Sequence, residues 1–278
     1  MNKLLLLPVL LCISYFTWPV KSGRVTSSFA EFRPDHLHDG IDMISSSSDV
    51  YPVEDGDLLY MWNKELFPFD DYTGSGNYKL ISHETYISQY LHLDDSSDSA
   101  KKVTTAEAIG KYANTGRSFG NHIHFCIIQP KDWSSINPFT LTQPIEDKRP
   151  PIISDLAFDI DGKIMIVKDK TTVRLTKDRP LLVKAFDEIN KGDRLGIYTL
   201  KVYHNNKIIK DIKFEKIISK DGQLLMAGKK FDEIFNSSFY LINGIKWING
   251  ENSFSVRVID YSGNESVKNF TLIANKEF

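Results

Sequence analysis

Hydrophobic and polar residues alternate along most of this chain, and few segments show the 3.6-residue period of an amphipathic helix. In the first half, residues 58–62, 78–82, 86–91 and 121–128 are short apolar or alternating runs between turn residues, as in β-strands. In the second half the same pattern recurs at residues 163–167, 181–186, 198–203, 239–242, 253–259 and 269–273. We therefore predict an all-β chain whose second half is an antiparallel β-sandwich.

The two halves are separated by a polar segment at residues 142–151 that contains three prolines and is typical of a linker. A length of 278 residues fits two domains of ordinary size. We predict a signal peptide or signal anchor over residues 1–16, a first domain over 17–140, a linker over 141–151 and a second domain over 152–278.

The N-terminus has one lysine followed by a short apolar run, which is typical of a secretory signal and short for a membrane span. Cleavage, an uncleaved anchor and lipidation at Cys12 are all left open. We expect an exported protein of the periplasm or cell envelope. Removal of the signal would leave Cys126 as the sole cysteine, so we expect no intramolecular disulfide.

Composition restricts the classes of partner. Hydrophobic residues are 41% and charged residues 25% of the chain, as in soluble globular proteins. The formal net charge of −2 provides no basic field, so we expect no nucleic-acid partner.

Six of the seven histidines fall between residues 36 and 124. His38 and Asp42 are near neighbours, and His122 and His124 point to one face if their segment is a strand. Imidazole and carboxylate groups suit a catalytic zinc ion, which takes three protein ligands and keeps a position open for water. Both strand histidines could bind the ion, or one could bind it while the other contacts the substrate.

Three motifs give the chain a resemblance to a known family. The sequence has His-x-x-x-Asp over residues 38–42, Tyr-Leu-His-Leu over 90–93 and His-Ile-His-Phe over 122–125. In this order they resemble the signature motifs of the M23 (lysostaphin/LytM-like) zinc metallopeptidases. The resemblance covers roughly residues 18–140 and implies an antiparallel β-sheet catalytic domain. Strand ends near residues 183–187 and 258–264 resemble those of bacterial immunoglobulin-like domains.

The resemblance also implies roles for five residues. His38, Asp42 and His124 would bind one Zn2+ per chain, while His92 and His122 would polarise the attacking water and stabilise the oxyanion. These roles agree with metal-activated hydrolysis assisted by imidazoles.

Four other residues near these motifs or in the second domain are given ordinary roles. We interpret His36 as a loop neighbour of the site, His83 as structural and His204 as solvated beside a hairpin turn. Cys126 shares a face with the strand histidines; we favour a small buried thiol over a residue near the metal.

The function implied is an exported zinc metalloendopeptidase that hydrolyses peptide bonds of peptidoglycan, in the stem peptide or cross-bridge. The alternative is a catalytically silent envelope protein that binds murein or activates another hydrolase. Peptidoglycan peptides are the expected partners. Spacer, substrate positioning and binding of an envelope protein are all open roles for the second domain, and we favour a positioning or docking module.

Overall fold

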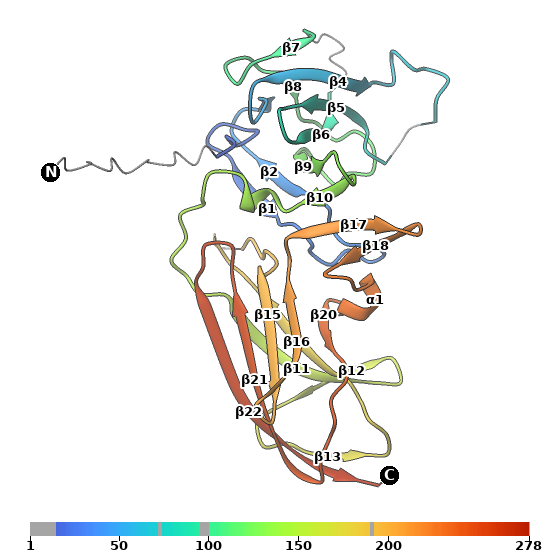
Figure 1. The fold of residues 1–278 in the computed structure, drawn as a ribbon, viewed down its shortest axis with the longest axis vertical. Coiled ribbons are helices and arrows are strands. Elements are labelled where there is room, and N and C mark those ends of the chain that lie inside the picture. Colours follow the sequence, from blue (N-terminus) through green and yellow to red (C-terminus); the bar gives the residue numbers. More distant parts are fainter. Residues whose placement is uncertain (1–14, 72–73, 95–99, 190–191, 278) are drawn as a thin grey trace, which may run out of the picture.

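The computed structural model describes residues 15–71, 74–94, 100–189 and 192–277, and it is built almost wholly of strands (Figure 1). The first half contains β1 (Arg24–Ser27), β2 (Ile41–Ile44), β3 (Asp49–Val50), β4 (Gly56–Trp62), β5 (Asn77–Ser82), β6 (Ile87–Leu93), β7 (Lys102–Val103), β8 (Gly110–Lys111), β9 (Ile123–Gln129), β10 (Ser134–Ile136) and the short 3-10 helix η1 (Pro138–Thr140).

The second half contains β11 (Ile152–Ile160), β12 (Lys163–Val167), β13 (Thr172–Leu175), β14 (Leu181–Phe186), β15 (Thr199–His204), β16 (Lys207–Lys213), β17 (Lys216–Lys220), β18 (Gln223–Met226), α1 (Phe231–Ile234), β19 (Phe235–Asn236), β20 (Phe239–Ile242), β21 (Gly250–Ile259) and β22 (Glu265–Lys276). The prediction of an all-β chain with antiparallel sheets is confirmed.

The central strand of the first half is β9. One side of β9 pairs with β6; the other pairs with β2 near its start and with β10 near its end. Residues Ile123–Ile127 of this strand are all buried, which explains its nearly continuous apolar sequence. The strand order β9-β6-β5-β4 extends the sheet away from β2.

The second half forms two five-stranded sheets, in the orders β12-β11-β14-β20-β19 and β13-β22-β21-β15-β16. Trp247 lies between them, with its ring 5.8 Å from Phe158 of β11 and 5.4 Å from Phe254 of β21. Among the strand pairs of the described residues, only β13 with β22 is parallel. This pair departs from the purely antiparallel sandwich that we expected, and the immunoglobulin-like assignment stays a prediction.

The hairpin β17–β18 leaves the second half and joins the sheet of the first. β17 pairs with β10, where Ser135 lies opposite Ile217, so one ten-stranded sheet contains strands from both halves (Figure 1). Neither strand of this hairpin was among the predicted ones. The pairing covers an edge of β10 that would otherwise expose unpaired backbone groups.

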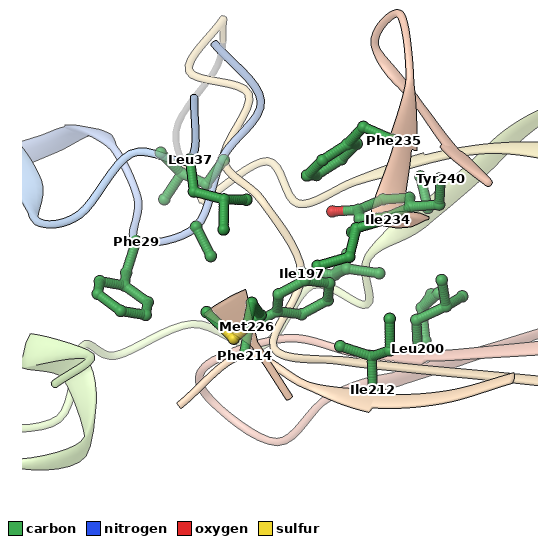
Figure 2. Packing of buried hydrophobic residues seen from close by; sticks show 14 of the residues in the cluster. Phe29, Leu37, Ile197, Leu200, Ile212, Phe214, Met226, Ile234, Phe235 and Tyr240 are labelled. Carbon is green, nitrogen blue, oxygen red and sulfur yellow. The ribbon is translucent and has the colours of Figure 1, made fainter. Parts of the chain in front are cut away.

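A shared hydrophobic core also connects the halves. Figure 2 shows Phe29 and Leu37 of the first half beside Phe214 and Met226 of the second. All four side chains are at most 1% exposed. Each half therefore loses buried apolar contacts if the other moves away.

The N-terminal segment is described only from residue 15. The predicted signal therefore lies almost entirely outside the described residues. Phe16, the last residue of that prediction, donates its backbone N–H to Leu141 O at 2.9 Å, and its ring lies 5.9 Å from that of Tyr86. Within the described part of the chain, no helix has both the length and the apolar character needed to cross a membrane.

Candidate metal centre and active site

Two strands bring the predicted metal ligands together. Asp42 of β2 lies directly opposite His124 of β9, so the two side chains share a face of the sheet. The Asp42 Oδ1 atom is 2.9 Å from His124 Nδ1 and 3.1 Å from His38 Nε2, and the two nitrogens are 3.0 Å apart. Ligand atoms on a tetrahedral zinc ion lie roughly 3.3 Å apart, given bonds of about 2.0–2.1 Å. The three donors therefore fit one ion.

Hydrogen bonds fix which nitrogen of each histidine is free for a metal. His38 Nδ1 donates to Ser28 O at 2.7 Å, which leaves the Nε2 lone pair pointing to Asp42. His124 has Asp39 Oδ1 3.3 Å and Cys126 Sγ 3.0 Å from its Nε2, which leaves Nδ1 free. Such outer partners orient metal-binding imidazoles and raise their basicity.

The segment between the first two ligands requires a glycine. A Cβ atom on Gly40 would lie 2.5 Å from Phe125 O and 2.8 Å from His124 Nε2. Only a residue without a side chain lets the loop carrying His38 approach β9 this closely.

The other two motif histidines lie beside this triad. His92 Nδ1 donates to Thr115 O at 2.8 Å and His122 Nδ1 donates to Gly120 O at 2.9 Å. Their ring centroids are 4.9 Å apart, and His122 Nε2 is 3.5 Å from Asp42 Oδ1. Among the described residues, neither histidine belongs to a set of three potential metal ligands whose donor atoms all lie within 4.8 Å of one another. Both therefore use Nδ1 to bond a backbone carbonyl and lie beside the triad without completing it.

His92 reaches the site through an unusual backbone conformation. Leu91 lies opposite His124, so regular alternation would turn His92 to the other face of the sheet. Instead His92 has φ 61°, a left-handed conformation that is uncommon for residues other than glycine. This reversal places its ring 6.0 Å from that of His124 and returns Leu93 to the core.

Burial and neighbouring charges set the ionisation of the site. Burial lowers the pKa of His92 to about 4, with the neighbouring imidazoles of His124 and His122 acting in the same direction. Burial opposes ionisation of Asp42, but the imidazoles of His38 and His124 outweigh it and hold the pKa of that carboxyl well below its usual range.

Cys126 behaves as a buried thiol. The residue is 1% exposed, and burial raises the pKa of its thiol to about 11. Its sulfur nevertheless lies beside His124, so it contacts the back of a candidate ligand while remaining protonated at neutral pH.

The five motif residues line one groove with a volume of about 850 Å³. His36 lies at its border and contacts Asp35, as expected of a loop neighbour. Leu224 of β18 also lines the groove, so the second half contributes to it. No signal in the sequence marked Leu224 as a groove residue.

The remaining two histidines are structural. His83 Nε2 lies 2.7 Å from Ser88 Oγ, as the structural interpretation of His83 expects. The prediction that His204 is solvated is wrong: it is 5% exposed, stacked 4.7 Å from Phe254 and bonded to Asn252. His204 is the last residue of β15 and faces inward before the turn begins.

Sequence reasoning missed several residues that support the site. Asp39 lies inside the first motif, so its place beside a ligand could have been considered. Arg33, whose Nη2 is 3.5 Å from Asp42 Oδ2, and Ser28 lie near the first motif in the sequence but carry no ligand signature. Their roles depend on the fold of the loop that carries His38.

Comparison with known proteins finds a family model that matches the part of the chain containing the five motif residues. Residues 36–138 match the model of peptidase family M23, and a second family model, which has no description, matches residues 150–275. The peptidoglycan DD-endopeptidase ShyA of Vibrio cholerae is 34% identical over 121 residues, which are 40% of this chain and 26% of ShyA. The chain therefore matches about a quarter of that relative's length.

Solved structures show partial likeness. LytU is 22% identical and covers 44% of this chain and 85% of its own, with a TM-score of 0.35. A catalytic-domain mutant of the prophage-encoded M23 protein EnpA from Enterococcus faecalis is 20% identical, covers 45% and 95%, and has a TM-score of 0.36. The catalytic domain of lysostaphin from Staphylococcus simulans is 16% identical, covers 42% and 90%, and has a TM-score of 0.34.

Proposed function

Since residues 36–138 of this chain match the model of peptidase family M23, we propose that it is an exported zinc metalloendopeptidase that hydrolyses peptide bonds of peptidoglycan. The observation that carries the proposal is the convergence of His38, Asp42 and His124 in a groove beside two further imidazoles. The substrate class is suggested by ShyA, whose matched region includes a quarter of its chain.

The metal-binding role is assigned to His38 Nε2, Asp42 Oδ1 and His124 Nδ1. Zinc is favoured over calcium or magnesium because two of three donors are imidazole nitrogens. When bound, zinc lowers the pKa of its water to about 7 and polarises a carbonyl. Asp39 and Ser28 hold the two imidazoles in the orientation that this role requires.

His92 and His122 are assigned the proton transfers and the stabilisation of negative charge. His92 is neutral at neutral pH, and its Nε2 can accept a proton because its Nδ1–H is held by Thr115 O. His122 is held in the same way by Gly120 O, and its side chain is 16% exposed. Positioned acid–base groups of this kind contribute about 10²–10⁴-fold to the rate.

The second half is assigned a positioning role. Its hairpin β17–β18 extends the catalytic sheet, and Leu224 of that hairpin forms part of the groove. A substrate chain in the groove would therefore contact both halves. Docking of another envelope protein on this half remains part of the proposal.

Digestion of purified peptidoglycan by the full chain, with zinc measured in the same preparations, tests the proposal. We expect about one zinc per chain and release of new amino termini, and loss of both in His124→Ala. His92→Ala and His122→Ala should retain zinc but lose turnover. Bound zinc without released termini would indicate the silent murein-binding alternative, and loss of zinc in His92→Ala or His122→Ala would contradict the assigned roles.

A further inference from the structure

Three carboxylates outside the groove meet at the junction of the two halves. Asp147 comes from the segment between the halves, Asp187 directly follows β14 and Asp260 directly follows β21. One oxygen of each lies within 4.8 Å of the others. Asp187 and Asp260 are 1% and 0% exposed, and the side chain of Asp147 is 4% exposed. We call these three residues the acidic cluster.

One oxygen of the acidic cluster is buried and has no protein partner. Asp147 Oδ2 is inaccessible to solvent and accepts no hydrogen bond from the described residues. The other oxygen, Asp147 Oδ1, accepts from the backbone N–H of Arg149 at 3.1 Å. Buried polar atoms normally have a partner, and an exception indicates a role or an ion or water that satisfies it.

The other two carboxylates are held in place by backbone amides. Asp260 Oδ1 accepts from Ser262 N and Asn264 N, both at 2.8 Å, and Asp187 Oδ1 accepts from Glu188 N at 2.8 Å. The neutral amide of Asn264 donates to Asp260 Oδ2 at 2.9 Å. These bonds orient the carboxylates but supply no full positive charge.

Charge compensation inside the acidic cluster is incomplete. Among the described residues, Arg149 forms an ion pair with the cluster: its Nε lies 3.9 Å from Asp147 Oδ1, and its side chain is half exposed. Burial, together with the charges of Asp260 and Asp147, raises the pKa of Asp187 to about 7. Without a further cation, the cluster must therefore hold a proton near neutral pH or bear repulsion between buried like charges.

We propose that the acidic cluster binds one hard divalent cation, with calcium as the first candidate. Calcium takes six to eight oxygen ligands and accepts carboxylates in flexible arrangements. The three residues of the acidic cluster offer only carboxylate oxygens, whereas the histidine groove also offers imidazole nitrogens. Carboxylate oxygens suit calcium or magnesium. A cation would use the unpaired Asp147 Oδ2 as a ligand and neutralise the buried charge.

Cation binding would stabilise the contact between the two halves. The ion would connect the segment at residues 141–151 to the ends of β14 and β21 in the second half. Tyr261, the neighbour of Asp260, donates its hydroxyl to Phe29 O at 2.9 Å and stacks on Phe139 at 4.2 Å. The cluster is thus continuous with contacts that hold the second half against the catalytic half.

Thermal unfolding of the zinc-loaded full chain, with calcium or magnesium added, tests the proposal. A cation at about 100 times its Kd should raise the Tm of wild type by about 5 °C or more. Asp147→Asn keeps an oxygen for Arg149 N but removes a charged ligand, so it should lose this shift. Without added cation its Tm should equal or exceed that of wild type, because repulsion is relieved.

Two further measurements make the test decisive. Equilibrium dialysis of wild type should detect one bound calcium or magnesium per chain, independently of any variant. Asp161→Asn, the same substitution at an exposed turn of the second half, should retain the shift. Zinc content should be unchanged in both variants, which separates this site from the proposed catalytic one. No bound cation in wild type, or an undiminished shift in Asp147→Asn, would overturn the proposal.

Discussion

Glu31 connects the catalytic groove with the second half through one partly buried carboxylate. Its Oε1 accepts from Ser28 N at 2.5 Å, Ser28 Oγ at 2.7 Å and Gly196 N at 3.2 Å. Its Oε2 accepts from Ser27 Oγ at 2.6 Å and Arg33 Nη1 at 3.2 Å. Ser28 in turn orients His38 through its carbonyl. We therefore predict that Glu31→Gln weakens both stability and metal binding.

The expected loss in the free energy of unfolding follows from the number of hydrogen-bond donors that Glu31 accepts from. A glutamine keeps one acceptor oxygen and places an NH2 group where the other was, so at least two of the five donors lose this acceptor. Gly196 N and Arg33 Nη1 each have a second acceptor, Ser28 Oγ and Phe32 O. Each buried donor left unsatisfied costs about 1–3 kcal/mol, and a hydroxyl can rotate to recover part of this. We expect the free energy of unfolding to fall by about 2–4 kcal/mol, with weaker zinc affinity because the carbonyl of Ser28 is less firmly placed.

Urea unfolding and zinc titration of the full chain measure the two effects. Glu84→Gln makes the same change at an exposed turn and should alter the free energy of unfolding by no more than about 0.5 kcal/mol. If Glu31→Gln is as stable as Glu84→Gln and binds zinc like wild type, the Glu31 carboxylate does not connect the metal site with the second half.

Asp39→Ala should weaken zinc binding about 10–100-fold, because His124 loses an orienting carboxylate; a competition titration against a chelator measures it, and an unchanged affinity would contradict the assigned orientation. Burial, with the charge of Lys229, lowers the pKa of Lys210 to about 8, so the unfolded chain binds more protons between that value and the ordinary 10.5. Stability should therefore rise with pH across this window, and Lys210→Met should remove the rise and add up to about 3 kcal/mol at pH 7, as urea unfolding across pH would show. Leu224→Ser should raise KM about 3–10-fold on a soluble muropeptide with little change in kcat, since apolar contact with bound substrate is lost; an unchanged KM would exclude contact between substrate and the hairpin.

Several features of the fold were readable from local sequence. Alternation and turn residues identified the main strands, and residues 163–167, 181–186 and 239–242 coincide with β12, β14 and β20. The turn at Asn205 and Asn206 was also predictable, because both residues adopt the positive φ angles that such hairpins require. These features depend on residues that are close in the sequence.

The sequence also predicted the residues of the candidate metal site, with the choice of ligands resting on the resemblance to the M23 family. Strand alternation placed His122 and His124 on one face, and the short motif brought Asp42 close to His38. Alternation by itself would have turned His92 away from the site, because Leu91 faces His124. Its φ of 61° reverses this direction, and a pattern of alternating residues does not encode such an angle.

The sequence by itself predicted the all-β class, most of the longer strands and a cluster of metal-binding side chains in the first half. Only the tertiary structure decided that β17 joins the catalytic sheet, that Leu224 reaches the groove and that Asp147, Asp187 and Asp260 meet. These arrangements join residues far apart in the chain, and their stability comes from edge pairing, shared apolar burial and charge compensation. Edge pairing, apolar burial and charge compensation depend on which surfaces meet after folding. They therefore leave no periodic pattern in the sequence.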